Sequence, residues 1–215
     1  GSIEIQGFRA DTPAHRLLDA VTRLRDAGMT FTLHGYLHGD GERCSFREVY
    51  PSLLSTVEDL HAHGDETIMV VHAFSDPHAA YETLLESTAR ALTELLEGLS
   101  IDRIPVRVCL EINRYHGVDT PGARYDGLLE IARRMEGLTI GFCWDMGHTC
   151  SSTRQNQLTA IPPSAFVRNV IHTHVHGLSP DGDTHRPLTE FRSHIVSGVR
   201  QLRSVGYRGI YNLEL

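Results

Sequence analysis

Residues 170–188, VIHTHVHGLSPDGDTHRPL, carry four histidines and two aspartates in nineteen positions. The first half of this stretch alternates as a β-strand does, so His172, His174 and His176 share one face. Imidazoles and carboxylates together suit Zn, Mn, Fe or Co, whereas Ca prefers an all-oxygen shell. Alternate residues of a strand lie about 6.6 Å apart, so the three imidazoles cannot all bind the same ion. We expect one or two of them to bind metal and the others to line the site or orient its ligands.

Metal-binding residue types recur at the C-terminal ends of the other predicted strands. Every strand after the first ends in such a residue, and the loop after residues 169–177 adds two more. The candidate metal ligands are His34, His72, Glu111, Asp145, His148, His174, His176, Asp183, His185 and Glu214. Taken singly, each has an ordinary alternative, because a strand-end histidine often only makes a hydrogen bond, and Asp145 or Asp183 could belong to a turn. Their joint placement favours a metal site.

The elements that would position these residues alternate between short apolar strands and amphipathic helices. Strands are predicted over residues 2–8, 29–36, 66–74, 105–113, 139–148, 169–177 and 209–215. Helices are predicted over residues 12–28, 45–64, 77–99, 123–137 and 189–207. Strands separated by helices pair in parallel, which predicts an α/β fold. A closed (β/α)8 barrel and an open doubly wound sheet both fit, although no Gly-rich phosphate-binding turn follows the first strand.

A parallel barrel would bring the candidate ligands together. All its strands open their C-terminal ends onto one face, and active sites lie on that face. By alternation, Trp144 is expected to point away from this interior and to pack against the helices. The chain shows no internal repeat or linker, so we expect a single domain over residues 1–215.

Composition limits the classes of function. The 215 residues, 40% hydrophobic and 22% charged, are enough for one sizeable core. A formal net charge of −7 disfavours a DNA-binding groove without excluding one. No two of the cysteines, Cys44, Cys109, Cys143 and Cys150, form a CxxC pair, so we expect free thiols in a reducing cytoplasm. No signal segment or long apolar run is present, so we expect a cytoplasmic protein without a membrane partner.

Four short motifs resemble those of the xylose-isomerase-like TIM-barrel superfamily, which includes endonuclease IV (AP endonuclease family 2), sugar epimerases and sugar-phosphate isomerases. In chain order the motifs are CLEIN, WDMGH, HVHG followed by DTH, and NLEL. The resemblance implies a (β/α)8 barrel. If residues 2–8 form its second strand, the first strand and helix are missing from this sequence or do not show in it. Two open edges would then need covering by a partner, for example in a homo-oligomer, or by further residues.

The isomerase and epimerase branch of this superfamily implies one ion. Its ligands here would be Glu111, Asp145, either His174 or His176, and Glu214. The ion would polarise a carbonyl and a hydroxyl of the substrate, and Glu111 and Glu214 would move a proton as general acid and base. Two arginines near the predicted mouth, Arg114 and Arg186, are candidates for binding a phosphate or sugar hydroxyl, with surface solvation as the alternative.

The endonuclease IV branch implies three ions and nine ligands, which here would be His34, His72, Glu111, Asp145, His148, His174, Asp183, His185 and Glu214. Water activated at the ions would attack phosphorus in DNA or in a small phosphoester. The sequence HGLSPDG replaces the Asn-Asp and lysine that follow the corresponding histidine in the DNA-repair members. We therefore favour a metal-dependent isomerase or epimerase of a small sugar or sugar phosphate, with a phosphoesterase second and a non-catalytic binding barrel third. The expected cofactor is one to three divalent ions.

Overall fold

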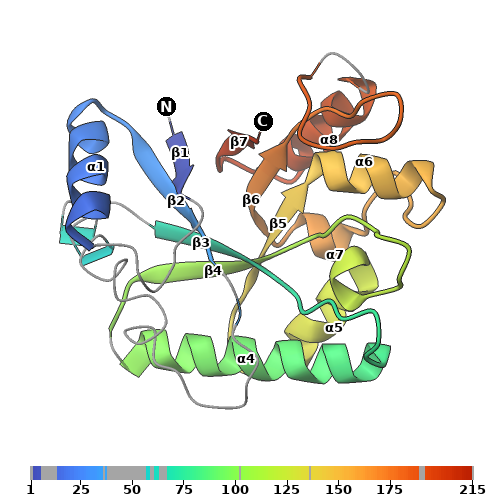
Figure 1. Cartoon of the computed structure of the whole chain (residues 1–215), viewed down its shortest axis with the longest axis horizontal. Helices are drawn as coiled ribbons and strands as arrows, with labels where there is room; N and C mark the ends of the chain where they lie inside the picture. The colour runs from blue at the N-terminus through green and yellow to red at the C-terminus, as the bar shows by residue number, and fades with distance from the viewer. Residues whose placement is uncertain are drawn as a thin grey trace.

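Seven parallel strands form the centre of the protein in the computed structural model (Figure 1). The structure describes residues 2–5, 14–35, 37, 57–58, 61–62, 67–101, 103–135, 137–188 and 192–214. The strands pair in chain order: β1 (Ser2–Ile5), β2 (Thr30–His34), β3 (Thr67–His72), β4 (Val106–Glu111), β5 (Gly141–Asp145), β6 (Val170–Val175) and β7 (Tyr211–Leu213). The predicted α/β fold with a parallel sheet is confirmed.

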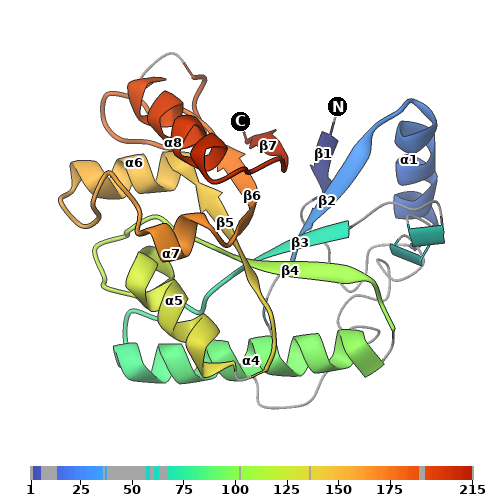
Figure 2. The same cartoon turned by 180° about the vertical axis from the view of Figure 1, so that it is seen from behind.

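Helices cover the outside of this sheet in both views (Figures 1 and 2). They are α1 (Ala14–Asp26), α4 (Tyr81–Ile101), α5 (Tyr125–Arg134), α6 (Met146–Arg154), α7 (Ser164–Val167) and α8 (Arg192–Ser204), with a 3₁₀ turn η1 (Pro121–Ala123) before α5. Helix α4 illustrates why the helices pack against the sheet. Its apolar residues recur at helical spacing, and those at 84, 85, 89, 92 and 99 are buried on one face. The predicted helix over residues 45–64 lies mostly outside the described residues.

The sheet curls into a nearly closed barrel. Strands β1 and β7, the first and last in the sheet order, lie side by side in both views (Figures 1 and 2). No backbone hydrogen-bond ladder joins β1 to β7 within the described part of the chain. Seven strands are described, where the resemblance implies eight.

Each strand presents one face to the barrel interior and one to the helices. On β4, Val108 and Leu110 belong to the large core between sheet and helices, whereas Cys109 faces inward. Glu111 is two residues beyond Cys109 and therefore shares its inward face. A small apolar layer fills the interior below the carboxylate and is made of Ile68, Val70, Cys109 and Cys143, with Ile171 against it. The polar residues at the strand ends thus lie directly above a packed apolar layer in the barrel interior.

Strand β5 follows the same alternation. Phe142 and Trp144 point outward and pack on Phe166 of α7, with ring centroids 5.0 and 6.3 Å apart. The indole N–H of Trp144 donates to Thr149 Oγ1 at 3.1 Å. The prediction that Trp144 packs against the helices is confirmed, and Asp145 is left to face the interior.

Most predicted elements differ from the observed ones by a few residues at their ends, and one difference changes the type of element. The predicted strand 139–148 was wrong at its C-terminal end, because β5 stops at Asp145 and α6 begins at Met146. The reason is the Asp145 carboxylate, which accepts the backbone N–H of His148 at 2.6 Å and caps the helix. His148 therefore lies in the first turn of a helix and not on a strand. Helices α6 and α7 were not predicted.

Two further sequence expectations concern thiols and membranes. Cys109, Cys143 and Cys150 are buried free thiols, as predicted, and burial raises the pKa of Cys143 well above its usual value. Cys44 lies outside the described residues. Among the described helices, none combines the length and the apolar character needed to cross a bilayer.

Candidate functional site

One buried imidazole nitrogen is surrounded by three carboxylates. His174 Nδ1 lies 3.4 Å from Glu111 Oε1, 3.8 Å from Asp145 Oδ2 and 3.3 Å from Glu214 Oε2. The nitrogen is buried and makes no hydrogen bond within the described residues. Donors bound at about 2.1 Å to one ion lie roughly 3–3.5 Å from one another, which matches the distances to Glu111 and Glu214 and is slightly shorter than the distance to Asp145. One nitrogen and three carboxylates therefore fit a divalent ion such as Zn, Mn, Fe or Co.

From the sequence, either His174 or His176 could belong to this group. The structure brings His174 to all three carboxylates. His176 directly follows β6, two residues after His174, and contacts only Asp145 among them, with Nε2 at 3.1 Å from Oδ1. Alternate residues of an extended chain are separated along its axis, so the two imidazoles reach different parts of the site.

A second group forms around the other oxygen of Glu111. His34 Nε2 and His72 Nε2 lie 3.2 and 2.9 Å from Glu111 Oε2. Register places His72 directly beside Glu111 on the neighbouring strands β3 and β4. The Glu111 carboxylate therefore connects this group to His174.

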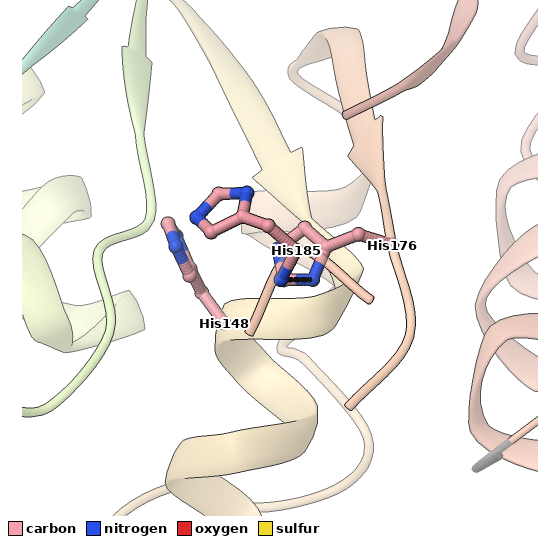
Figure 3. A group of neighbouring side chains, drawn as sticks. All are labelled: His148, His176 and His185. Carbon is pink, nitrogen blue, oxygen red and sulfur yellow. Dashed lines mark hydrogen bonds between the residues drawn. The ribbon is translucent and has the colours of Figure 1, made fainter. Parts of the chain in front are cut away.

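A third group consists of His148, His176 and His185, which Figure 3 shows converging from α6, the end of β6 and the following loop. The rings of His176 and His185 stack with centroids 4.4 Å apart, and the backbone N–H of His185 donates to His176 Nδ1 at 3.0 Å. Asp145 links this group to His174, because its Oδ2 lies 3.2 Å from His148 Nδ1. Glu111 and Asp145 thus connect all three groups.

Two predicted site residues lie apart from these groups. Asp183 and Arg186 are half exposed, and their side chains form an ion pair with each other. The pairing follows from an antiparallel bridge between Gly177 and Arg186, which turns the loop back on itself. The Asp183 carboxylate therefore faces Arg186 and not the imidazoles.

Glu4 on β1 was not predicted as a site residue. It is buried, and its carboxylate accepts hydrogen bonds from the Nε2 atoms of His172 and His174, each at 3.0 Å. The sequence contained a signal. In SIEI, Glu4 alternates with Ile3 and Ile5, so a lone carboxylate was placed on the opposite face from two apolar residues.

The carboxylates and imidazoles of the site shift one another's pKa. Burial opposes the charge on Glu111, but the neighbouring His174, His72 and His148 hold its pKa well below the usual value. Burial likewise opposes protonation of His148, yet Asp145 and Glu111 raise the pKa of His148 to about 9. The pKa of His174 is also raised, mainly by Glu111, against the effect of burial. The neighbouring carboxylates therefore favour the protonated form of both imidazoles.

Metal affinity is expected to increase with pH. A divalent ion beside Glu111 and Asp145 would neutralise the carboxylates that raise the pKa of His148 to about 9, so His148 should lose its proton on binding, and affinity should rise from about pH 6 to about pH 9 and then level off. Isothermal titration in buffers of different ionisation enthalpy should show at least one proton released per ion at pH 7. Affinity that is independent of pH, with no proton release, would contradict this.

A cavity of about 280 Å³ opens beside His72 and His148. Its lining mixes polar and apolar surface, and among the described residues it includes no carboxylate: His72, Ser75, Pro77, Asn113, Arg114, His116, Val118, Thr120 and His148. Arg114 Nε and Asn113 Oδ1 are buried there without a hydrogen-bond partner in the described structure. Such groups fit the hydroxyls or the anionic group of a small polar ligand. Arg114 thus lines the cavity next to the candidate metal-binding groups, whereas Arg186 does not.

The fold and the site both agree with one known family. The family of xylose isomerase-like TIM barrels matches residues 1–215. The chain belongs to the xylose isomerase-like TIM barrel family. The resemblance given by the four motifs is therefore confirmed at the level of the family. A comparison with curated proteins gives no match.

Several solved structures share the fold of this family member. A D-tagatose 3-epimerase-like protein has a TM-score of 0.66 at 18% identity, over 98% of this chain and 80% of that one. A D-allulose 3-epimerase from Methylomonas sp., in complex with D-allulose, has a TM-score of 0.64 at 14% identity, over 99% and 72% of the two chains. An L-ribulose 3-epimerase has a TM-score of 0.63 at 16% identity, over 99% and 70%. At these identities the likeness shows the barrel fold.

Proposed function

We propose that the protein is a divalent-metal-dependent isomerase or epimerase of a small sugar or sugar phosphate. The observation that carries the proposal is His174 Nδ1, buried without a hydrogen bond among Glu111, Asp145 and Glu214. Three structures of similar fold are named as 3-epimerases or as epimerase-like, which supports sugar chemistry. The family match is compatible with this class of enzyme and equally with a phosphoesterase, so the choice rests on these structures.

Glu111 and Glu214 would move the proton. They approach His174 Nδ1 at 3.4 and 3.3 Å from opposite ends of the group of ligand-bearing strands, which supports a substrate bound to the ion lying near both carboxylates. When bound, the ion would polarise the carbonyl and the adjacent hydroxyl of the sugar. One carboxylate would then remove the proton from the carbon beside the carbonyl, and the other would return a proton to the opposite face. The result is inversion at that carbon, with no net change in atoms.

The cavity beside His72 would hold the rest of the sugar. Arg114 and Asn113 offer a donor and an acceptor that have no partner within the described structure. Each would be satisfied by a sugar hydroxyl or, at Arg114, by a phosphate.

Solvent exchange tests this proposal directly. The protein is incubated in D₂O with Mn²⁺ or Co²⁺ and each of D-allulose, D-tagatose and L-ribulose, and the sugars are followed by NMR. We expect deuterium to appear at the carbon beside the carbonyl of at least one sugar, together with its epimer or isomer. Absence of exchange with these sugars and their phosphates, in protein shown to hold metal, would exclude the proposed chemistry.

A multinuclear phosphoesterase is the second candidate. It is favoured by Glu111 and Asp145, each of which connects two groups of histidines. Elemental analysis of purified protein separates the candidates. We expect about one ion per chain for the isomerase, whereas two or three ions, with release of p-nitrophenol from its phosphodiesters, would replace our proposal with hydrolysis.

A further inference from the structure

We propose that Glu4 is a positioning residue that holds the imidazole of His174 with Nδ1 toward the metal. This inference rests on the proposed metal centre at Glu111, Asp145, His174 and Glu214. Glu4 lies on the far side of the His174 ring from that centre. It comes from β1, the strand for which the sequence analysis named no candidate ligand.

The two nitrogens of His174 have different partners. Nε2 lies 3.0 Å from the Glu4 carboxylate, whereas Nδ1 faces Glu111 and Glu214. An ionised carboxylate can only accept a hydrogen bond, so it requires the proton to be on Nε2. A neutral imidazole with its proton on Nε2 has its lone pair on Nδ1, which is then available to an ion. Glu4 therefore selects both the tautomer and the orientation of the ring.

Glu4 is itself held in place. His172 Nε2 donates to it at 3.0 Å, and the hydroxyl of Thr32 on β2 donates to Oε2 at 3.2 Å. The Glu4 side chain is only 3% exposed. Donors from β2 and β6 thus fix the carboxylate from two sides, which limits how far the His174 ring can turn.

A buried carboxylate is poorly suited to a purely structural role at this position. Burying a carboxylate costs free energy, and an apolar side chain of similar size would fill the space at lower cost. The negative charge beside Nε2 makes the imidazole a stronger donor to a cation at Nδ1. We therefore expect the loss of the charge to weaken metal binding more than it weakens the fold.

The test measures metal affinity without any sugar. Wild type, Glu4→Gln, Glu4→Asp and Thr32→Val compete with a chromophoric chelator for Zn²⁺ at one pH, and circular dichroism in EDTA checks that each is folded. Glu4→Gln keeps the shape and removes the charge, so we expect its Zn²⁺ affinity to fall about 10- to 100-fold. Thr32→Val removes one of the hydrogen bonds that hold Glu4 but leaves the charge and the His172 donor, so we expect a smaller loss of affinity, of less than about threefold.

A folded Glu4→Gln variant with the affinity of wild type would overturn the proposal. Glu4→Asp keeps the charge at a shorter reach and should recover part of the affinity.

A measurement on the wild type alone tests the proposal even if the variants fail to fold. In the Zn²⁺-loaded protein, ¹⁵N NMR should show His174 bound through Nδ1 and protonated at Nε2, and the opposite assignment would overturn the proposal. These measurements use no sugar, so a protein that binds metal as described but exchanges no sugar proton would refute only the proposed function. Wild type that binds no divalent ion would refute both.

Discussion

Replacing Glu111 by glutamine is expected to lower turnover by about 10²- to 10⁴-fold, the usual contribution of a general acid or base. The same change should weaken metal binding, because Oε1 faces His148 and His174 and Oε2 faces His34 and His72. Glutamine keeps the shape but brings two N–H donors and loses the charge that these imidazoles face. Steady-state rates with the sugar found by deuterium exchange, at saturating metal, give the effect on turnover.

The matched control for Glu111→Gln is Glu130→Gln. Glu130 lies on the outer helix α5, where it pairs with Arg133 and Arg134. Its replacement should leave turnover and metal affinity unchanged. A Glu111→Gln variant with normal turnover would remove this residue from the mechanism, and an equal loss in Glu130→Gln would point to a general effect of the substitution.

Replacing Gly147 by alanine is expected to displace the ring of His176. A Cβ at this position would lie 1.9 Å from His176 Cε1, closer than any real contact. Gly147 sits in the first turn of α6, directly after β5, so its backbone cannot retreat without moving Asp145. We expect the free energy of unfolding to fall by about 1–3 kcal/mol, the usual cost of overpacking. Zn²⁺ affinity should fall with it, because His176 and Asp145 are in contact.

Gly198→Ala is the control for Gly147→Ala. Gly198 is also a helical glycine, and the nearest atom to its added Cβ is Met146 Sδ at 2.9 Å, in a flexible side chain that can move. Chemical denaturation in EDTA and chelator competition compare the two variants. If Gly147→Ala binds Zn²⁺ as tightly as Gly198→Ala does, the contact between His176 and Asp145 does not contribute to metal binding.

Periodicity predicted the parts of this fold that depend on burial. Strands such as β3 are nearly continuous runs of β-branched residues, and their position between helices implies parallel pairing. Because parallel strands share the direction of their C-terminal ends, the sequence also indicated which polar side chains would meet. The structure brings together all the candidate ligands except Asp183.

The remaining differences come from local hydrogen bonds and from pairings between distant residues. The Asp145 carboxylate stops β5 by capping α6, and alternation alone does not reveal when a strand residue will cap a helix. Asp183 pairs with Arg186 three residues later, a local alternative that competes with a distant site. Glu4 meets His172 and His174 from the other end of the chain, and no short motif could show that contact.

The side chains around His174 Nδ1 come from four successive strands, β4 to β7. An ion can be captured there only after all four strands have paired. Contacts that form late are mostly absent from the folding transition state, so they act on the rate of unfolding more than on the rate of folding. The ion would therefore contribute mainly kinetic stability, by slowing the separation of strands that the chain has already assembled.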